Sequence, residues 1–127
     1  MALTVLFVLV GLELKHYAAD YLLQPSWLLG GKGDLAAAGG YIHAGIHVLG
    51  TAIVLLAAGI GIIAIALICL AEFFVHYAID YVKYRYGRVD MAAAPWRFWA
   101  LHGFDQMLHQ LTYAGIMFAA MLTLPFG

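Results

Sequence analysis

The sequence predicts an all-α membrane protein whose 127 residues form one domain, a bundle of four transmembrane helices. The first observation is composition: 65% of the residues are hydrophobic and 10% are charged, with a mean hydropathy of +0.93. Soluble domains carry about 25% charged residues, so this apolar excess is too large for one soluble core. The second observation is that four segments reach the roughly 20 residues that a helix needs to cross a bilayer, if their polar residues face inward.

Each predicted span is bounded by a helix-breaking residue or by a change in composition. The spans cover about residues 2–24, 40–58, 61–84 and 95–124. Pro25 ends the first span, and Pro95 suits the first turn of the fourth. Only Gly59–Gly61 separates the second span from the third, so these two should form a tight antiparallel hairpin. The segment from Pro25 to Gly39 is expected to be a loop.

The positive charges indicate the orientation of the bundle. Five of the six lysines and arginines lie in or beside the loops that follow the first and third spans: Lys32, Lys83, Arg85, Arg88 and Arg97. Because short loops rich in Lys and Arg remain in the cytoplasm, both loops are predicted to be cytoplasmic and both termini outside. An interfacial aromatic belt is expected around the same loops, made by Trp27, Tyr84, Tyr86, Trp96 and Trp99.

Ionisable residues are frequent inside the predicted spans, where they are costly. The spans contain all six histidines, His16, His43, His47, His76, His102 and His109, and five of the seven acids, Glu13, Asp20, Glu72, Asp80 and Asp105. A charged group near the bilayer centre costs at least ~2.5–3.5 kcal/mol on insertion scales, so such groups normally face the bundle interior and mark function.

The ionisable residues share one depth and one face on each helix. At 1.5 Å per residue, those nearest the cytoplasmic helix ends lie within roughly 10 Å of them, and the others lie only slightly deeper. On the first span, for example, His16, Asp20 and Gln24 fall within an arc of about 80°. The sequence therefore predicts four polar stripes that meet as a buried layer in the cytoplasmic part of the bundle.

Imidazole and carboxylate groups at one-turn spacing favour a divalent metal site, with zinc, manganese or iron as the candidate ions. The predicted metal ligands are His16, Asp20, His43, His47, His76 and Asp80. Asp105 and His109 are the candidate catalytic residues, which either bind a metal or orient its ligands. This set exceeds what one tetrahedral zinc needs, so a two-metal site is possible. A metal-bound water there would serve hydrolysis of a substrate from the cytoplasmic leaflet, such as a lipid phosphoester.

Several of these motifs together resemble the signature of a known family. The motifs are His16-Tyr-Ala-Ala-Asp20 with Gln24, His43-Ala-Gly-Ile-His47, His76-Tyr-Ala-Ile-Asp80 with Lys83, and Asp105-Gln106 with His109. They resemble a family of small bacterial inner-membrane proteins defined as a domain of unknown function, similar in style to small membrane proteins labelled as metal-dependent hydrolases. The resemblance implies a multi-pass protein of the bacterial inner membrane. Glu13, Lys15, Glu72 and His102 are not part of the pattern.

Other functions stay open on the sequence alone. The chain would serve as a non-catalytic accessory subunit of a larger membrane complex if the polar layer only orders the bundle and the apolar faces bind lipids, pigments or neighbouring subunits. Paired histidines also permit haem binding, although the carboxylates match a porphyrin poorly. A proton or ion pathway is disfavoured because the outer half of the bundle is apolar.

Two kinds of chemistry are not expected. The net charge of −1 gives no basic surface for nucleic acid. Cys69 is the only cysteine, so the sequence offers neither an internal disulfide nor a cluster of thiolate ligands. The partners expected from the sequence are therefore membrane lipids and, under the alternative function, other membrane subunits.

Overall fold

The structure, a computed structural model, describes residues 1–124, and this part of the chain is helical without strands. The elements are α1 (Ala2–Tyr17), η1 (Ala18–Leu22), α2 (Ser26–Gly31), α3 (Ala38–Ala57), α4 (Ile62–Tyr86) and α5 (Pro95–Met121). The η1 segment is a π-helical turn that continues α1 directly. The predicted all-α class is confirmed.

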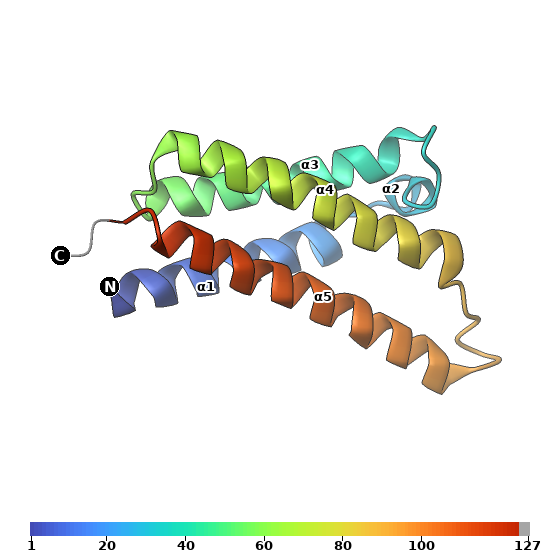
Figure 1. The fold of residues 1–127 in the computed structure, drawn as a ribbon. Helices are drawn as coiled ribbons and strands as arrows, with labels where there is room; N and C mark the ends of the chain where they lie inside the picture. The colour runs from blue at the N-terminus through green and yellow to red at the C-terminus, as the bar shows by residue number, and fades with distance from the viewer. Residues whose placement is uncertain (125–127) are drawn as a thin grey trace.

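The four long helices run alternately up and down (Figure 1). Met1, the turn between α3 and α4, and the last turn of α5 lie at one end of the bundle. The short helix α2 and the loop between α4 and α5 lie at the other, which we call the α2 end. Both α1 and α4 pack against α3, and α5 packs against α1 and α4, so the four helices surround one interior.

Within residues 1–124, three helices are long and apolar enough to cross a membrane: α1 with η1, α3 and α4. Their ends lie within two residues of the predicted spans. At 27 residues α5 also has the length, but its polar residues, among them His102, Asp105 and Gln106, lower its hydropathy. The count of four spans and their orientation in the membrane stay predictions.

The expected loop between the first two spans contains a helix that was not predicted. Pro25 has an extended backbone and precedes α2, which buries Leu28 against α3. The contact is so close that a Cβ atom on Gly39 would lie 2.7 Å from the carbonyl oxygen of Leu28. This glycine-dependent approach holds the end of α2, and with it Lys32, against the bundle.

The predicted hairpin between α3 and α4 closes through Gly59, whose φ of +79° lies in the left-handed region that glycine adopts without steric cost. Beside this turn the bundle interior is apolar. Its buried residues include Val8, Leu12, Leu55, Ile65, Ile116 and Ala120. We call this region the apolar half. It leaves the polar residues to the half of the bundle near the α2 end.

Candidate metal centre

The eight predicted site residues lie together in the interior of the bundle, and we call them the polar cluster: His16, Asp20, His43, His47, His76, Asp80, Asp105 and His109. They come from α1, η1, α3, α4 and α5. All are buried except Asp20, whose side chain is 12% exposed. His102, the sixth histidine, is half-buried and stacks on Phe98. One interior therefore collects the polar stripes of four long helices.

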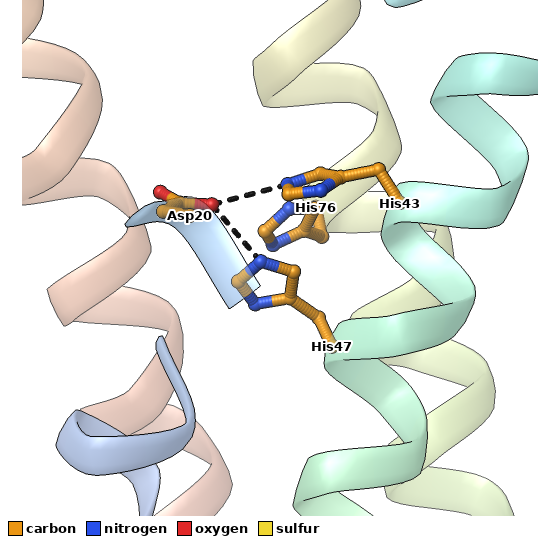
Figure 2. A group of neighbouring side chains, drawn as sticks. All are labelled: Asp20, His43, His47 and His76. Carbon is orange, nitrogen blue, oxygen red and sulfur yellow. Dashed lines mark hydrogen bonds and ion pairs between the residues drawn. The ribbon is translucent and has the colours of Figure 1, made fainter. Parts of the chain in front are cut away.

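One group of four residues in the polar cluster could hold a metal ion. Asp20, His43, His47 and His76 each offer one ligand atom, and these atoms all lie within 4.8 Å of one another. The Asp20 Oδ1 atom is 3.1 Å from Nε2 of His43 and 3.1 Å from Nε2 of His47 (Figure 2). The rings of His47 and His76 are 3.9 Å apart between centroids. Three imidazoles and one carboxylate form a donor set that suits zinc and related divalent ions.

A second group adjoins the first. The ligand atoms of His76, Asp80 and His109 also lie within 4.8 Å of one another. Asp80 Oδ2 is 3.5 Å from Nε2 of His76 and 3.4 Å from Nε2 of His43, and Asp80 Oδ1 is 3.9 Å from Nε2 of His109. Because His76 belongs to both groups, the two candidate sites are neighbours.

Several buried polar atoms in these groups lack a partner with hydrogen-bond geometry among residues 1–124. They are Nε2 of His43, His76 and His109. The Oδ2 atom of Asp80 also lacks an aligned hydrogen bond, but it forms an ion pair with Lys32 Nζ at 2.8 Å. Some of these atoms face each other within ion-pair distance, but the approach is not aligned as a hydrogen bond. A buried polar atom without a partner costs about 1–3 kcal/mol, so native proteins rarely keep one without a reason. A cation bound among these nitrogens and oxygens would satisfy them.

The hydrogen bonds around His16 assign its tautomer. Gln106 donates through Nε2 to Asp105 Oδ2 at 3.2 Å, which fixes the orientation of the amide because a carboxylate only accepts. The Gln106 Oε1 atom then accepts from His16 Nε2 at 2.8 Å. With its proton on Nε2, neutral His16 has a lone pair on Nδ1, which lies 2.8 Å from the hydroxyl of Tyr113. The Tyr113 hydroxyl therefore donates to His16.

The same chain continues to His47. The Tyr113 hydroxyl, whose proton goes to His16, lies 3.2 Å from His47 Nδ1 and can only accept there. Lys15 Nζ lies 3.4 Å from the same nitrogen and, as an ammonium with three protons, can donate to it as well as to Glu72 Oε1 at 2.6 Å and to the His47 carbonyl oxygen at 3.3 Å. The Tyr113 contact places the His47 proton on Nδ1 and the lone pair on Nε2, and the Lys15 contact places them the other way round. His47 Nε2 lies 3.1 Å from Asp20 Oδ1, so it faces the carboxylate either as a free ligand atom or as a hydrogen-bond donor.

His109 has one ring nitrogen held by the backbone and the other without a hydrogen-bond partner among residues 1–124. Its Nδ1–H donates to the backbone carbonyl of Asp105 at 2.9 Å, and a carbonyl oxygen can only accept. The lone pair is therefore on Nε2, which faces Asp80 and lies among the unpaired atoms. A ring nitrogen held by a carbonyl while the other is free is the usual arrangement of metal-binding histidines.

Two predicted site residues lie beside the candidate ligand groups rather than in them. Both ring nitrogens of His16 have protein partners, Gln106 and Tyr113, although Nε2 is also 3.4 Å from Asp20. Asp105 interacts with Lys83 at 2.6 Å and with Gln106. The predicted role of His16 as a ligand, and the predicted catalytic roles of Asp105 and His109, stay predictions.

Three lysines reach the polar cluster or its edge. The sequence analysis placed Lys83 in the motif that contains His76 and Asp80, but it did not assign Lys15 or Lys32 to the site. Lys32 pairs with Asp80 at 2.8 Å, Lys83 with Asp105, and Lys15 with Glu72 at 2.6 Å. Lys15 and Glu72 could have been paired from the sequence, because a lone cation and a lone anion at similar depths in two spans need each other. Lys32 could not, because its approach depends on the unpredicted helix α2.

Tyr113 is another residue of the candidate site that the sequence analysis missed. It is 1% exposed, and its hydroxyl joins His16 to His47. Its position one helical turn after His109, which itself follows Asp105 by one turn, is the signal that could have found it. A tyrosine inside an apolar helix was otherwise indistinguishable from a packing residue.

A cavity of about 350 Å³ opens beside the polar cluster at the α2 end. Asp20, Asp80 and Asp105 line it, together with the cationic side chains of Lys32, Lys83 and Arg88. The candidate metal centre is therefore adjacent to a space that a ligand can occupy.

Comparison with known proteins identifies the family. Residues 7–125 match DUF3307, a family described as a protein of unknown function, and the chain belongs to this family. The resemblance drawn from the sequence motifs to a family of unknown function is confirmed. No curated protein and no solved structure matches the chain.

Proposed function

We propose that this member of the DUF3307 family is a four-span membrane protein that binds a divalent metal ion in the polar cluster. One observation carries the proposal: ligand atoms of Asp20, His43, His47 and His76, in the interior of the bundle, all lie within 4.8 Å of one another. The separations also fit, since two ligands about 2.0–2.2 Å from a tetrahedral ion lie roughly 3.4 Å apart, and Asp20 Oδ1 is 3.1 Å from Nε2 of both His43 and His47.

The proposed first site uses Asp20, His43, His47 and His76, and the proposed second site uses Asp80 and His109 with His76 at their junction. Unpaired Nε2 atoms on His43, His76 and His109 among the described residues support this assignment. His16 then supports the ligands rather than binding the metal. It forms hydrogen bonds with Gln106 and with Tyr113, and the Tyr113 hydroxyl contacts the ligand His47. Zinc, manganese and iron all accept such a donor set.

The proposed orientation places the α2 end at the cytoplasmic face of a bacterial inner membrane. Five of the six cationic side chains lie there, and Lys15 alone lies deeper. Trp27, Trp96 and Trp99 at the same end are each more than half exposed, as residues of an interfacial belt should be. We take α5 as the fourth span because it packs along α1 and α4 and turns Asp105 and His109 inward.

The proposed chemistry is hydrolysis of an ester that reaches the cavity from the membrane. A divalent ion held in the cluster would polarise the ester and activate a water molecule. The residues of the chain would exclude bulk water and hold the ligands, because the polar cluster is buried while the adjoining cavity is open at the α2 end. In the reaction water adds to the central atom of the ester, the ester bond breaks, and the proton of the water passes to the leaving oxygen.

Elemental analysis tests the metal. The protein purified in mild detergent without chelator should contain about one or two equivalents of zinc, manganese or iron. His47→Ala should lose the metal, whereas His102→Ala, which changes a histidine outside both ligand groups, should retain it. If the unaltered protein contains no stoichiometric metal, and also binds none when each ion is supplied, the proposal is wrong and His47 Nε2–H instead donates a hydrogen bond to Asp20.

Two other functions are distinguished by the same preparation. An accessory subunit would co-purify stably with a larger membrane assembly, and large apolar side chains exposed on every long helix are compatible with such contacts as well as with lipid. A haem protein would show a Soret band. The tight packing of the histidine rings, with centroids 3.9 Å apart for His47 and His76 and 4.4 Å apart for His76 and His109, argues against a porphyrin between them.

A further inference from the structure

Two hollows meet between α4 and α5 at the α2 end. The first is the charged cavity beside the polar cluster, and the second is a groove of about 490 Å³. They share four lining residues, Lys83, Gly87, Leu101 and Asp105. Because they share these residues, the hollows form the two sides of one opening. The ribbons of α4 and α5 diverge toward this end of the bundle (Figure 1).

The two sides differ sharply in chemistry. Beyond the shared residues, the groove is lined by apolar side chains such as Ile79, Val82, Phe104 and Leu108 and by Tyr86. Val82 and Phe104 are more than half exposed, so in a membrane this groove would face lipid. The cavity on the other side contains the carboxylates of the polar cluster and the cationic side chains at its edge. The opening is therefore apolar toward the bilayer and charged toward the candidate metal centre.

The charges of the cavity favour an anion once a metal is bound. Three aspartates and three cationic side chains line the cavity, so these charges balance, and a divalent ion in the cluster would make the total positive. Lys32 and Lys83 already pair with Asp80 and Asp105. Arg88 donates through Nε to the carbonyl oxygen of Tyr84, and within residues 1–124 it forms no ion pair. Arg88 is thus available to a phosphate group, which its planar guanidinium recognises well.

We propose that the opening between α4 and α5 binds a membrane lipid with an anionic phosphate head group. The head group occupies the charged cavity, where it faces the metal centre and Arg88, and an acyl chain follows the apolar groove. This inference rests on the proposed metal site and names its substrate class as a phosphorylated lipid. The groove explains why the occupant is an amphiphile rather than a soluble phosphate: its apolar lining begins at residues that also border the cavity.

Lipid retention measured by native mass spectrometry tests the inference on the metal-loaded protein. The probes are didecanoyl phosphatidic acid, didecanoyl glycerol, which lacks the phosphate, and glycerol phosphate, which lacks the chains. Phosphatidic acid should bind at least tenfold more tightly than either of the others. Chelation of the metal should weaken its binding.

Two variants separate the head-group contact from the chain contact. Arg88→Gln and Val82→Trp should each weaken phosphatidic acid binding about tenfold, the first by removing a cation and the second by filling the groove. Leu67→Trp is the matched control, because Leu67 is an exposed residue of α4 outside both hollows and its replacement should change nothing.

The outcomes distinguish this inference from the proposed function. If the metal binds but glycerol phosphate binds as tightly as phosphatidic acid, or Val82→Trp and Leu67→Trp behave alike, the lipid site is wrong and the metal site stands. Unchanged binding in Arg88→Gln contradicts the head-group contact even if Val82→Trp fails to fold. If elemental analysis finds no metal, the proposed function is wrong, and the lipid site that rests on it is wrong as well.

Discussion

The two halves of this bundle are built from the same four helices but are filled by different means. In the apolar half, Val8, Leu55 and Ala120 are fully buried against other apolar side chains. In the polar half, His43 and His47 are buried to the same extent, among other imidazoles and carboxylates. Burial alone therefore does not distinguish the halves. What distinguishes them is that one half is satisfied by packing and the other leaves polar atoms to be satisfied.

The difference indicates which half is under functional demand. Between membrane helices, apolar side chains are held by van der Waals packing without a hydrophobic driving force. The apolar half is therefore stable if its side chains have complementary shapes. The polar half keeps unpaired buried nitrogens and oxygens, each of which costs free energy in the absence of a ligand. A bundle selected only for stability would have an apolar interior along its whole length. The polar half is therefore the half that we propose binds a ligand.

The strongest way to break the comparison is to remove a ligand from the polar half and an apolar residue from the other. His76→Ala should abolish stoichiometric metal binding, because His76 belongs to both ligand groups. Leu55→Ala should instead destabilise the protein by about 2–5 kcal/mol, through loss of packing, while the metal remains. Elemental analysis and thermal unfolding in detergent, measured on both variants, check the prediction. A loss of metal in Leu55→Ala comparable with that in His76→Ala would contradict the separation of the halves.

The boundary between the halves contains a buried ion pair, Lys15 with Glu72. Lys15→Met should destabilise the protein by about 3–5 kcal/mol, because it leaves the Glu72 carboxylate, which is 1% exposed, without its cation. The double change Lys15→Met with Glu72→Leu should recover most of that loss, since it removes both charges. Thermal unfolding of Lys15→Met, Glu72→Leu and the double variant forms a double-mutant cycle. If the losses of stability in the two single variants add up to the loss in the double variant, Lys15 and Glu72 do not stabilise each other.

Sequence reasoning predicted the ends of the long helices, and it placed the eight residues of the polar cluster in one interior, for a physical reason. Hydrophobic runs set the helices, and the 3.6-residue period places His16 and Asp20, or His43 and His47, on one face of their helix whatever the tertiary contacts are. The arrangement inside the cluster could not be predicted in this way. Which imidazole faces Asp20, and which is held by Tyr113, depends on the rotation of each helix against its neighbours.

The unpredicted helix α2 illustrates the second limit. Its six residues have no hydrophobic period long enough to detect, and its place depends on a backbone contact with Gly39. Lys32 therefore looked like a cytoplasmic loop charge, although it is 3% exposed and paired with Asp80. Sequence patterns report the depth of a residue in a span much better than the neighbours of a residue in a loop.

Tyr113 sharpens the comparison because it belongs to both halves: its ring packs in the apolar core and its hydroxyl joins His16 to His47. Tyr113→Phe should keep the packing and remove the hydroxyl that lies 2.8 Å from His16 Nδ1 and 3.2 Å from His47 Nδ1. We expect a metal affinity about 10–100-fold lower and a small change in stability. Metal titration by calorimetry measures the first and thermal unfolding the second. Thr112→Val is the control, because its hydroxyl donates only to the Leu108 carbonyl in its own helix. Equal metal affinity in Tyr113→Phe and the unaltered protein would remove Tyr113 from the metal centre.

The smallest expected effect tests the edge of the polar half. Gly39→Ala places a methyl group 2.7 Å from the carbonyl oxygen of Leu28, so α2 must shift as a unit. Because α2 is short and peripheral, we expect a loss of about 1 kcal/mol, at the low end of overpacking costs. Gly45→Ala lies on the same helix with no atom near its new methyl group, and should gain about 0.5–1 kcal/mol from helix propensity. A lower unfolding temperature in Gly39→Ala and a higher one in Gly45→Ala would show that the close approach of α2 to Gly39 stabilises the polar half. If Gly39→Ala is as stable as Gly45→Ala, the contact that positions Lys32 is not needed for the fold.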